Sequence, residues 1–378
     1  QGGQFTPAAA FATLVGDLKC PPYTVHESCD FTKRESADEM MRGTLPLRCG
    51  LDVASLADAK KLTRRLADAG TIEALFRLHR EHGDGFNQIH VAACWVKLGR
   101  LAHGQAGRSL HRDAGALMPL LRRSLRMLEA GDVDGRQLTT MAHGVASVGF
   151  GRKPPWAKFW TAVNDGIRDR AGELNPRDIA NAAWAYATIR HPAPTVFQNL
   201  EVAARGQAFM FSPQCLANTA WAFATVSFSA PALFNRLATV AEERVSDFKP
   251  QDLASFAWAC AHALHVEPTL FDSLAAAAHL RAGDFNAQDL ANIAWAYAAA
   301  VYASPSLFDA LAVPVTSRAR LISSQGLANI AWAYAVVGHP GPRVYGAVAV
   351  AALRRAREFT PLGLTTLLWA YASLKPCA

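Results

Sequence analysis

The chain has 378 residues, of which 51% are hydrophobic and 18% are charged, and its formal net charge is +7. This length and apolar content suffice for one elongated domain with a continuous core, and no apolar run approaches the 18 residues that indicate a transmembrane helix. The seven Cys stand at irregular positions without a CxxC pair. That pattern argues against a disulfide framework and favours free thiols in a reducing compartment.

The first part of the chain differs from the rest. Residues 1–56 are rich in Pro and Gly and show no periodicity, which predicts an extended N-terminal arm. Residues 57–133 are predicted to hold capping helices, in the stretch LTRRLADAGTIEALFRLHREHG, followed by a degenerate repeat. The basic excess of the chain lies in this second segment, so its charge is compatible with nucleic-acid binding. The basic residues are Arg64, Arg65, Arg108, Arg112, Arg122, Arg123 and Arg126.

Residues 134–378 are predicted to form a helical-repeat array. A Trp recurs there every 37 residues within near-copies of the phrase LANIAWAYA, and a fixed period of this size is typical of a solenoid. Upstream the copies decay, with His143 in the Trp place of QLTTMAHGVASVG and Ala93 in that of NQIHVAACWVKLG. The last repeat is truncated and the chain begins at Gln1, which predicts a fragment or a trimmed product. The Trp series is Trp184, Trp221, Trp258, Trp295, Trp332 and Trp369.

Each repeat is predicted to consist of helix A, a short loop, helix B and a second short loop. In the copy over 212–248, Ser212 is a good N-cap, Pro213 suits a first turn, and the following LANTAWAFATV contains neither Gly nor Pro. A second proline, Pro231, opens helix B, whose apolar stripe includes Phe234. The sequence therefore predicts an all-α fold, a right-handed α-solenoid of two-helix repeats without strands.

One polar strip interrupts the apolar surface of helix A on a helical wheel. Counted from the Trp as position 0, the strip consists of positions −7, −3 and +4, which lie one above another. Gln and Asn both donate and accept hydrogen bonds, so the strip suits the edges of successive bases. The predicted RNA-binding residues are Arg177, Asn181, Thr188, Gln214, Asn218, Thr225, Gln251, Ser255, His262, Gln288, Asn292, Gln325, Asn329 and Thr366.

The repeated residues also have structural interpretations. The amide at −3 suits a hydrogen bond to the backbone of the next repeat, which would fix the packing of the stack. The Trp series, amid Ala at helical spacing, is predicted to lie in the core rather than to stack on bases. Two further series suit either RNA contact or packing and helix capping. They are the loop series His191, Phe228, His265, Tyr302 and His339, and the Arg series Arg244, Arg281, Arg318 and Arg355.

The phrase LANIAWAYA with its 37-residue two-helix period resembles the octotricopeptide-type repeats of organelles. It is also similar to the leucine-rich region of FAST-kinase-domain proteins and to helical subunits of the RNA-editing substrate-binding complex. The resemblance covers residues 60–375, where TIEALFRLHREHGDGFNQIHVAACWVKLG is similar to the segment that precedes such arrays. It implies binding of single-stranded RNA, a role in RNA processing, stability, editing or translation, and protein subunits of a ribonucleoprotein complex as further partners.

The sequence thus predicts sequence-selective single-stranded RNA binding in an organelle, with the mitochondrial matrix favoured over the plastid stroma. The alternative is an armadillo-like protein-binding scaffold within a ribonucleoprotein complex, although armadillo repeats are longer, at about 40–47 residues. No enzyme is expected, because the chain has no HExxH motif, no glycine-rich phosphate loop and no nucleophile motif. No catalytic residue, cofactor, metal ligand or membrane partner is predicted.

Overall fold

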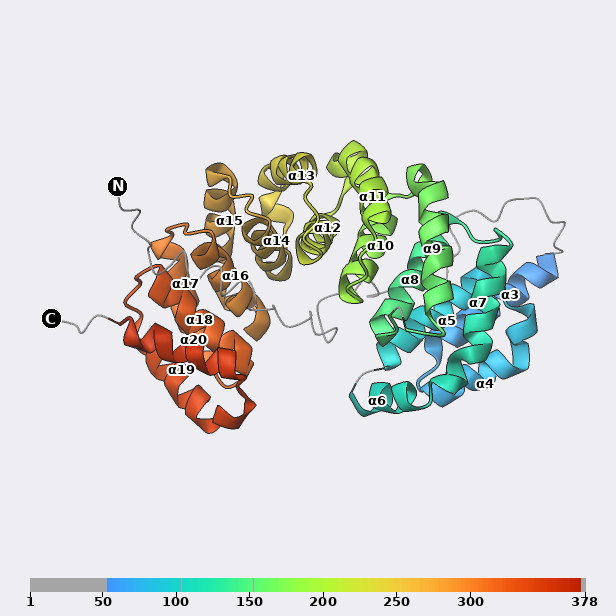
Figure 1. The fold of residues 1–378 in the computed structure, drawn as a ribbon, viewed down its shortest axis with the longest axis horizontal. Helices are drawn as coiled ribbons and strands as arrows, with labels where there is room; N and C mark the ends of the chain where they lie inside the picture. The colour runs from blue at the N-terminus through green and yellow to red at the C-terminus, as the bar shows by residue number, and fades with distance from the viewer. Residues whose placement is uncertain (1–52, 103, 152, 375–378) are drawn as a thin grey trace. The chain divides into compact units, whose positions relative to one another are not determined.

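The computed structural model describes residues 53–102, 104–151 and 153–374, and all regular secondary structure within these ranges is helical. The described residues form two compact units, 53–207 and 208–374 (Figure 1). The predicted N-terminal arm lies outside the described residues as far as residue 52. The division into an arm, a capping segment and an array therefore stays a prediction.

The unit of residues 208–374 is built from the predicted helices A and B in alternation. Helices A are α12 (Pro213–Thr225), α14 (Pro250–His262), α16 (Ala287–Ala299), α18 (Ser324–Val336) and α20 (Pro361–Ala372). Helices B are α13 (Pro231–Glu243), α15 (Pro268–Leu280), α17 (Pro305–Arg318) and α19 (Pro342–Arg354). Short 3₁₀ turns are η4 (Ala208–Met210), η5 (Val245–Asp247), η6 (Ala282–Asp284) and η7 (Ala356–Glu358).

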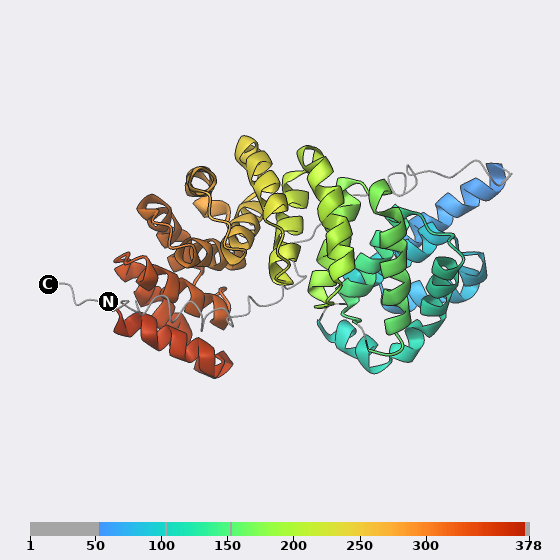
Figure 2. The same ribbon diagram turned by 45° about the horizontal axis from the view of Figure 1, so that its top comes forward.

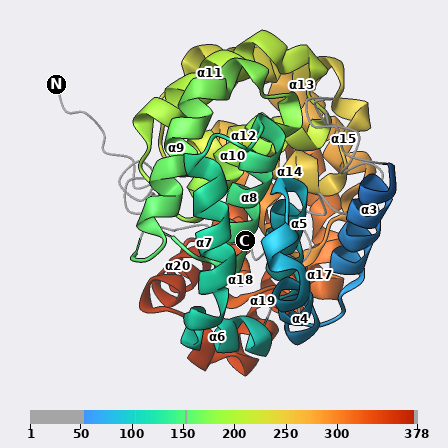
Figure 3. The same ribbon diagram turned by 90° about the vertical axis from the view of Figure 1, so that its right-hand side faces the viewer.

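These helices form two rows. Each helix A packs against the next helix A, from α12 to α20, and each helix B packs against the next helix B, from α13 to α19. Figure 3 shows α13 and α15 outside α12 and α14, and Figure 2 shows the helix pairs following one another in chain order from yellow to red. The prediction of an all-α solenoid of two-helix repeats is confirmed.

The ends of helix A follow the predicted capping chemistry. At the start of α12, the Ser212 hydroxyl accepts a hydrogen bond from the Cys215 amide at 3.2 Å, and Pro213 occupies the first turn. The helix stops at Ser227, whose φ of 55° is left-handed. The same left-handed conformation recurs at each later corner of this unit, at Leu264, Val301 and Gly338. Only the last is a glycine, which adopts this conformation without steric cost.

The unit of residues 53–207 repeats the same plan with less regular helices. One row contains α3 (Val53–Asp68), α5 (Gln88–Leu101), α8 (Gly135–Val148) and α10 (Pro176–Thr188), and the other contains α7 (Met118–Glu129), α9 (Ala157–Arg170) and α11 (Pro194–Gln207). The remaining elements are α4 (Ile72–His82), α6 (Gly104–Arg112), η1 (Gly83–Gly85), η2 (Ala114–Leu117) and η3 (Ala171–Glu173). The phrases around Ala93 and His143 thus lie on α5 and α8, which pack in the same row as α10.

The core runs between the two rows of each unit. In the described ranges, no helix combines the length and apolar character that crossing a membrane requires. The Trp residues of positions 184, 221, 258, 295 and 332 are all at most 7% exposed. The prediction that the Trp series belongs to the core is confirmed for these five.

Candidate nucleic-acid interface

The polar strip lies along the row of helices A, and its positions differ in exposure. At −7, in the first turn of each helix A, the four Gln of the unit 208–374 are half-buried. At +4, near the last turn, Thr225 and His262 are also half-buried. The −7 and −3 side chains of one repeat lie one helical turn apart, whereas +4 lies about 10 Å farther along the helix, at 1.5 Å per residue.

The middle of the strip is less exposed than a helical wheel predicts. Asn218 is 9% exposed, Ser255 is 3% exposed and Thr366 is fully buried, and Asn292 and Asn329 are buried as well. The expectation that position −3 escapes burial is therefore wrong. A helical wheel describes one helix in isolation. In the stack, each inner helix A has another helix A on both sides. These neighbours approach closely because the Ala side chains between them are small, and they cover position −3.

Hydrogen bonds divide the −3 side chains into two kinds. The hydroxyls of Ser255 and Thr366 donate to carbonyls of their own helix, four residues back, at 2.7 and 2.9 Å. Asn329 Oδ1 instead accepts from Gln325 Nε2 at 2.9 Å, so the −3 amide orients the −7 amide of the same repeat. The Nδ2 atom of Asn218 is buried and has no hydrogen-bond partner among the described residues.

The first repeat of the strip belongs to the other unit and shows the same arrangement. On α10, Arg177 and Thr188 are half-buried and Asn181 is 8% exposed. Asn181 Oδ1 and Thr188 Oγ1 are buried without a hydrogen-bond partner in the described part of the chain. A buried polar atom without a partner costs about 1–3 kcal/mol. Asn181 and Asn218 stand at the same position of their repeats, and the unpartnered atom within the described ranges is Oδ1 in the first and Nδ2 in the second.

Aromatic rings line the row of helices A next to the strip. The ring of His262, at +4, stacks on that of Trp258 with centroids 4.7 Å apart, and the Trp258 and Trp295 rings are 6.0 Å apart. The Trp295 and Trp332 rings are 6.4 Å apart. Burial lowers the pKa of His262, so the ring is neutral at pH 7. One face of the half-buried imidazole is thus covered by Trp258, and the ring extends the line of aromatic residues that continues through Trp295 and Trp332.

Tyrosines at position +2 make the hydrogen bonds that join successive repeats, and the sequence analysis did not assign them this role. The Tyr297 hydroxyl donates to the Phe271 carbonyl of the preceding helix B at 2.6 Å. Tyr334 and Tyr371 make the equivalent bonds, at 2.7 and 2.5 Å. The recurrence of tyrosine at position +2 could have indicated this role, because its hydroxyl needs a hydrogen-bond partner when buried. The helical spacing by itself predicts only that position +2 is buried.

The Arg series ties helix B to the start of its own repeat. Arg244 Nη1 donates to the Phe211 carbonyl at 2.7 Å, and Arg355 Nη1 donates to the Ile322 carbonyl at 2.6 Å. Arg281 and Arg318 make the same bond, to the carbonyls of Phe248 and Phe285. These guanidinium groups cap the backbone just before helix A, which favours the structural interpretation over phosphate contact.

The loop series packs against the preceding helix B. The Tyr302 hydroxyl donates to Asp272 Oδ1 at 2.8 Å, and its ring lies 5.3 Å from that of Phe271. His339 Nε2 lies 3.0 Å from Asp309 Oδ1. Both contacts cover the corner between repeats, so the structure favours the packing interpretation here too.

Two thiols of the described ranges, those of Cys94 and Cys260, are buried in the core. Burial raises the pKa of the Cys94 and Cys260 thiols far above their usual range, which keeps them protonated and unreactive. Within those ranges, no group of three His, Cys, Asp or Glu side chains is placed to hold a metal ion.

Comparison with known proteins adds one finding to this geometry. A protein-family model described as RNA-editing substrate-binding complex 6 protein matches residues 110–374. A search of curated proteins found no match.

Proposed function

Because the chain belongs to the family of RNA-editing substrate-binding complex 6 proteins, we propose that it binds single-stranded RNA selectively as part of an RNA-editing complex. Its partners are then RNA and the protein subunits of that complex. We further propose the mitochondrial matrix as its location. Cell fractionation with protease protection tests this location, and recovery of the protein outside the organelle would contradict it.

The proposal depends on a difference between two sets of side chains, the tyrosines at position +2 and the amides at position −3. If the Asn series existed to join repeats, its amides would bond the neighbouring repeat. Instead, tyrosine hydroxyls supply such bonds, while Asn218 Nδ2 and Asn181 Oδ1 have no partner among the described residues. The half-buried Gln side chains at −7 are then the amides that can meet a ligand offering both donors and acceptors, as the edges of bases do.

The different exposure of the three positions supports different proposed roles along the strip. The half-buried Gln at −7 and the variable residue at +4 contact the base. The buried amide at −3 orients the −7 side chain, as Asn329 does for Gln325. In the repeat of α14, the His262 ring adds a stacking face. Only unpaired bases can reach these positions, because a duplex keeps its base edges within the helix.

A selection from randomised single-stranded RNA tests this proposal. His262→Thr gives the repeat of α14 the +4 residue of its neighbour, Thr225, and leaves the buried Ser255 in place. The preferred base should change at one position of the selected motif, with a discrimination of about 1–3 kcal/mol, on the scale of side-chain-to-base pairs in DNA. Asn235→Ala, at an exposed polar position on α13, is the matched control and should leave the motif unchanged.

Two results would overturn the proposal. A motif that is identical in the wild type and the His262→Thr variant would show that the strip does not read bases. An absence of RNA binding at low salt, with tight capture of an extended peptide, would support the armadillo-like scaffold instead. Duplex RNA of the same sequence should bind more weakly than the single strand.

A further inference from the structure

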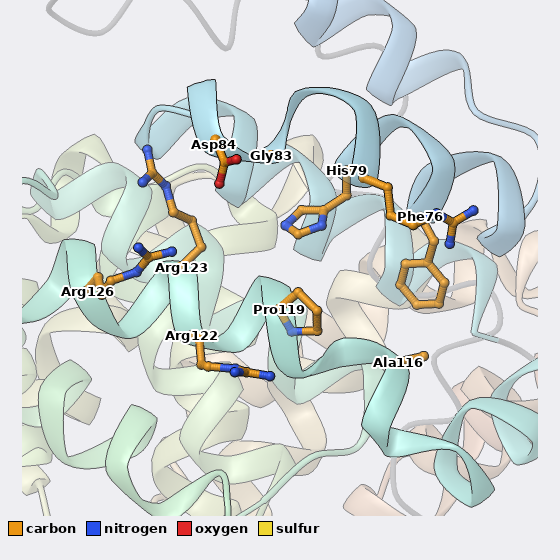
Figure 4. Close-up of a pocket in the computed structure, with 10 residues that line it drawn as sticks. Phe76, His79, Gly83, Asp84, Ala116, Pro119, Arg122, Arg123 and Arg126 are labelled. Atoms are coloured by element: carbon orange, nitrogen blue, oxygen red, sulfur yellow. The ribbon is translucent and has the colours of Figure 1, made fainter.

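A second polar feature lies in the unit of residues 53–207, apart from the strip. A pocket of about 490 Å³ opens between two segments of this unit. One segment consists of α4 and η1, and the other consists of η2 and α7. Arg122, Arg123 and Arg126 extend from α7, and Phe76 and His79 come from α4 (Figure 4). The lining residues are Phe76, His79, Arg80, Gly83, Asp84, Ala116, Pro119, Arg122, Arg123 and Arg126.

The four arginines of this basic pocket are not equivalent. Arg123 donates from Nε and Nη2 to the Phe86 carbonyl, at 3.2 and 2.5 Å, and so has the capping role of the Arg series. Arg80, Arg122 and Arg126 are exposed, and within the described ranges none of them forms an ion pair with a carboxylate. Asp84 is the one acidic lining residue, so the pocket carries a clear positive excess.

Two rings border the arginines. Phe76 is half-buried, and the His79 ring packs edge-on against Phe86 with centroids 5.3 Å apart. Burial lowers the pKa of His79, and Arg123 adds to this, although Asp84 acts in the opposite direction. At pH 7 the imidazole therefore contributes a neutral ring, and the charge of the pocket comes from arginine alone.

We propose that this basic pocket holds phosphate groups of the bound RNA. Guanidinium groups present a planar fork that pairs with phosphate oxygens in bidentate fashion, and every cation of the pocket is an arginine rather than a lysine. The adjacent rings suit a base or ribose next to the phosphate. An acidic peptide would satisfy the charge but makes less use of the rings. This inference rests on the proposed RNA binding, to which it adds a contact that is independent of base sequence.

The salt dependence of RNA affinity tests the pocket. Each phosphate contact of a single strand contributes about −0.7 to the slope of log affinity against log salt. Arg80→Gln, Arg122→Gln and Arg126→Gln together should therefore make the slope shallower by about 2, if each contacts one phosphate. The single variant Arg126→Gln should shift it by about 0.7. The selected base motif should stay unchanged in both proteins, because phosphates carry no sequence information.

A matched control separates the pocket from general charge. Lys61→Gln, Lys153→Gln and Lys158→Gln remove the same charge from exposed positions of the same unit, outside the pocket. A slope change as large in this control would overturn the inference, as would an unchanged slope in the pocket variant. Either result leaves the strip untouched, because its test is the base motif. Arg123 is kept in all variants, and circular dichroism checks that each protein remains helical.

The source of the phosphate is resolved by the choice of probe. RNA with a 5′-phosphate and the same RNA with a 5′-hydroxyl should bind equally if the pocket holds internal phosphates. A loss of affinity without the 5′-phosphate, seen in the wild type but not in the pocket variant, would assign it to the RNA end. Binding of an acidic peptide that the three substitutions abolish, with RNA affinity unaffected, would overturn the inference.

Discussion

His143 occupies on α8 the place that Trp holds in later repeats, and its ring lies 4.6 Å from that of Trp184. Burial, with Arg177 and Arg100 nearby, lowers the pKa of His143 to about 4. Asp178, in the first turn of α10, is also buried, and this burial raises its pKa to about 6. Folding thus weakens proton binding at one side chain and strengthens it at the other.

We expect His143→Phe to remove part of the pH dependence of unfolding. Between pH 6.5 and about 4 the unfolded chain protonates this histidine and the folded unit does not, so wild-type stability falls as the pH falls. The stabilisation lost is on the order of 3 kcal/mol. Urea unfolding at a series of pH values measures the difference between the two proteins, and parallel curves would contradict the expectation.

Asp178 must be neutralised in that experiment. Between about pH 4 and 6 the folded unit holds a proton on Asp178 that the unfolded chain has lost, so this group makes stability fall as the pH rises. Because the two effects have opposite signs in the same window, both proteins should carry Asp178→Asn. Without that substitution the two opposing effects would partly cancel, so the free energy of unfolding would vary less with pH than it would with either group alone.

At the scale of elements, the tyrosine bonds between repeats should contribute measurably to stability. Tyr297→Phe removes a buried hydroxyl whose partner is the Phe271 carbonyl, while the ring and its packing remain. The expected cost is about 1 kcal/mol in the free energy of unfolding. Tyr302→Phe is the control, because its hydroxyl bonds are exposed; a control that costs as much as Tyr297→Phe would refute this role.

The joint between α13 and α14 lacks this bond, because Cys260 stands where the next two repeats have Tyr297 and Tyr334. A tyrosine at 260 would place its hydroxyl toward the Phe234 carbonyl, as Tyr297 does toward the Phe271 carbonyl. We expect Cys260→Tyr to increase the free energy of unfolding by about 1–2 kcal/mol. The midpoint of thermal unfolding should rise accordingly. A lower midpoint would show that the neighbouring side chains do not leave room for the ring.

The sequence predicted elements better than contacts. Helix A of 212–248 was predictable because Ser212, Pro213 and the uninterrupted apolar run act locally, and α12 starts where they place it. The burial of Asn218 was not predictable, since it depends on α14 at its side rather than on the wheel of α12. The hydrogen-bond partner of Arg244 was not predictable either, because Phe211 lies 33 residues away in the sequence.

At the scale of the unit of residues 208–374, the extensive helix contacts join each repeat to its neighbours, so stability is shared through the interfaces. Trp258→Ala should cost about 3–5 kcal/mol by core truncation. The side chain contacts Trp295 of the next repeat, so amide hydrogen exchange should rise in α16 as well as in α14. Val313→Ala, at a site 73% exposed, is the control and should change neither. Faster exchange confined to α14 would contradict this coupling.

The missing tyrosine at Cys260 has a mechanical consequence. A row of repeats under tension is a chain of joints in series, and it fails first at the weakest joint. If unit 208–374 is stretched in an optical trap, rupture should begin between α13 and α14, where the Phe234 carbonyl receives no tyrosine hydroxyl, and the α16–α18 joint should part later. Cys260→Tyr should move the first rupture elsewhere.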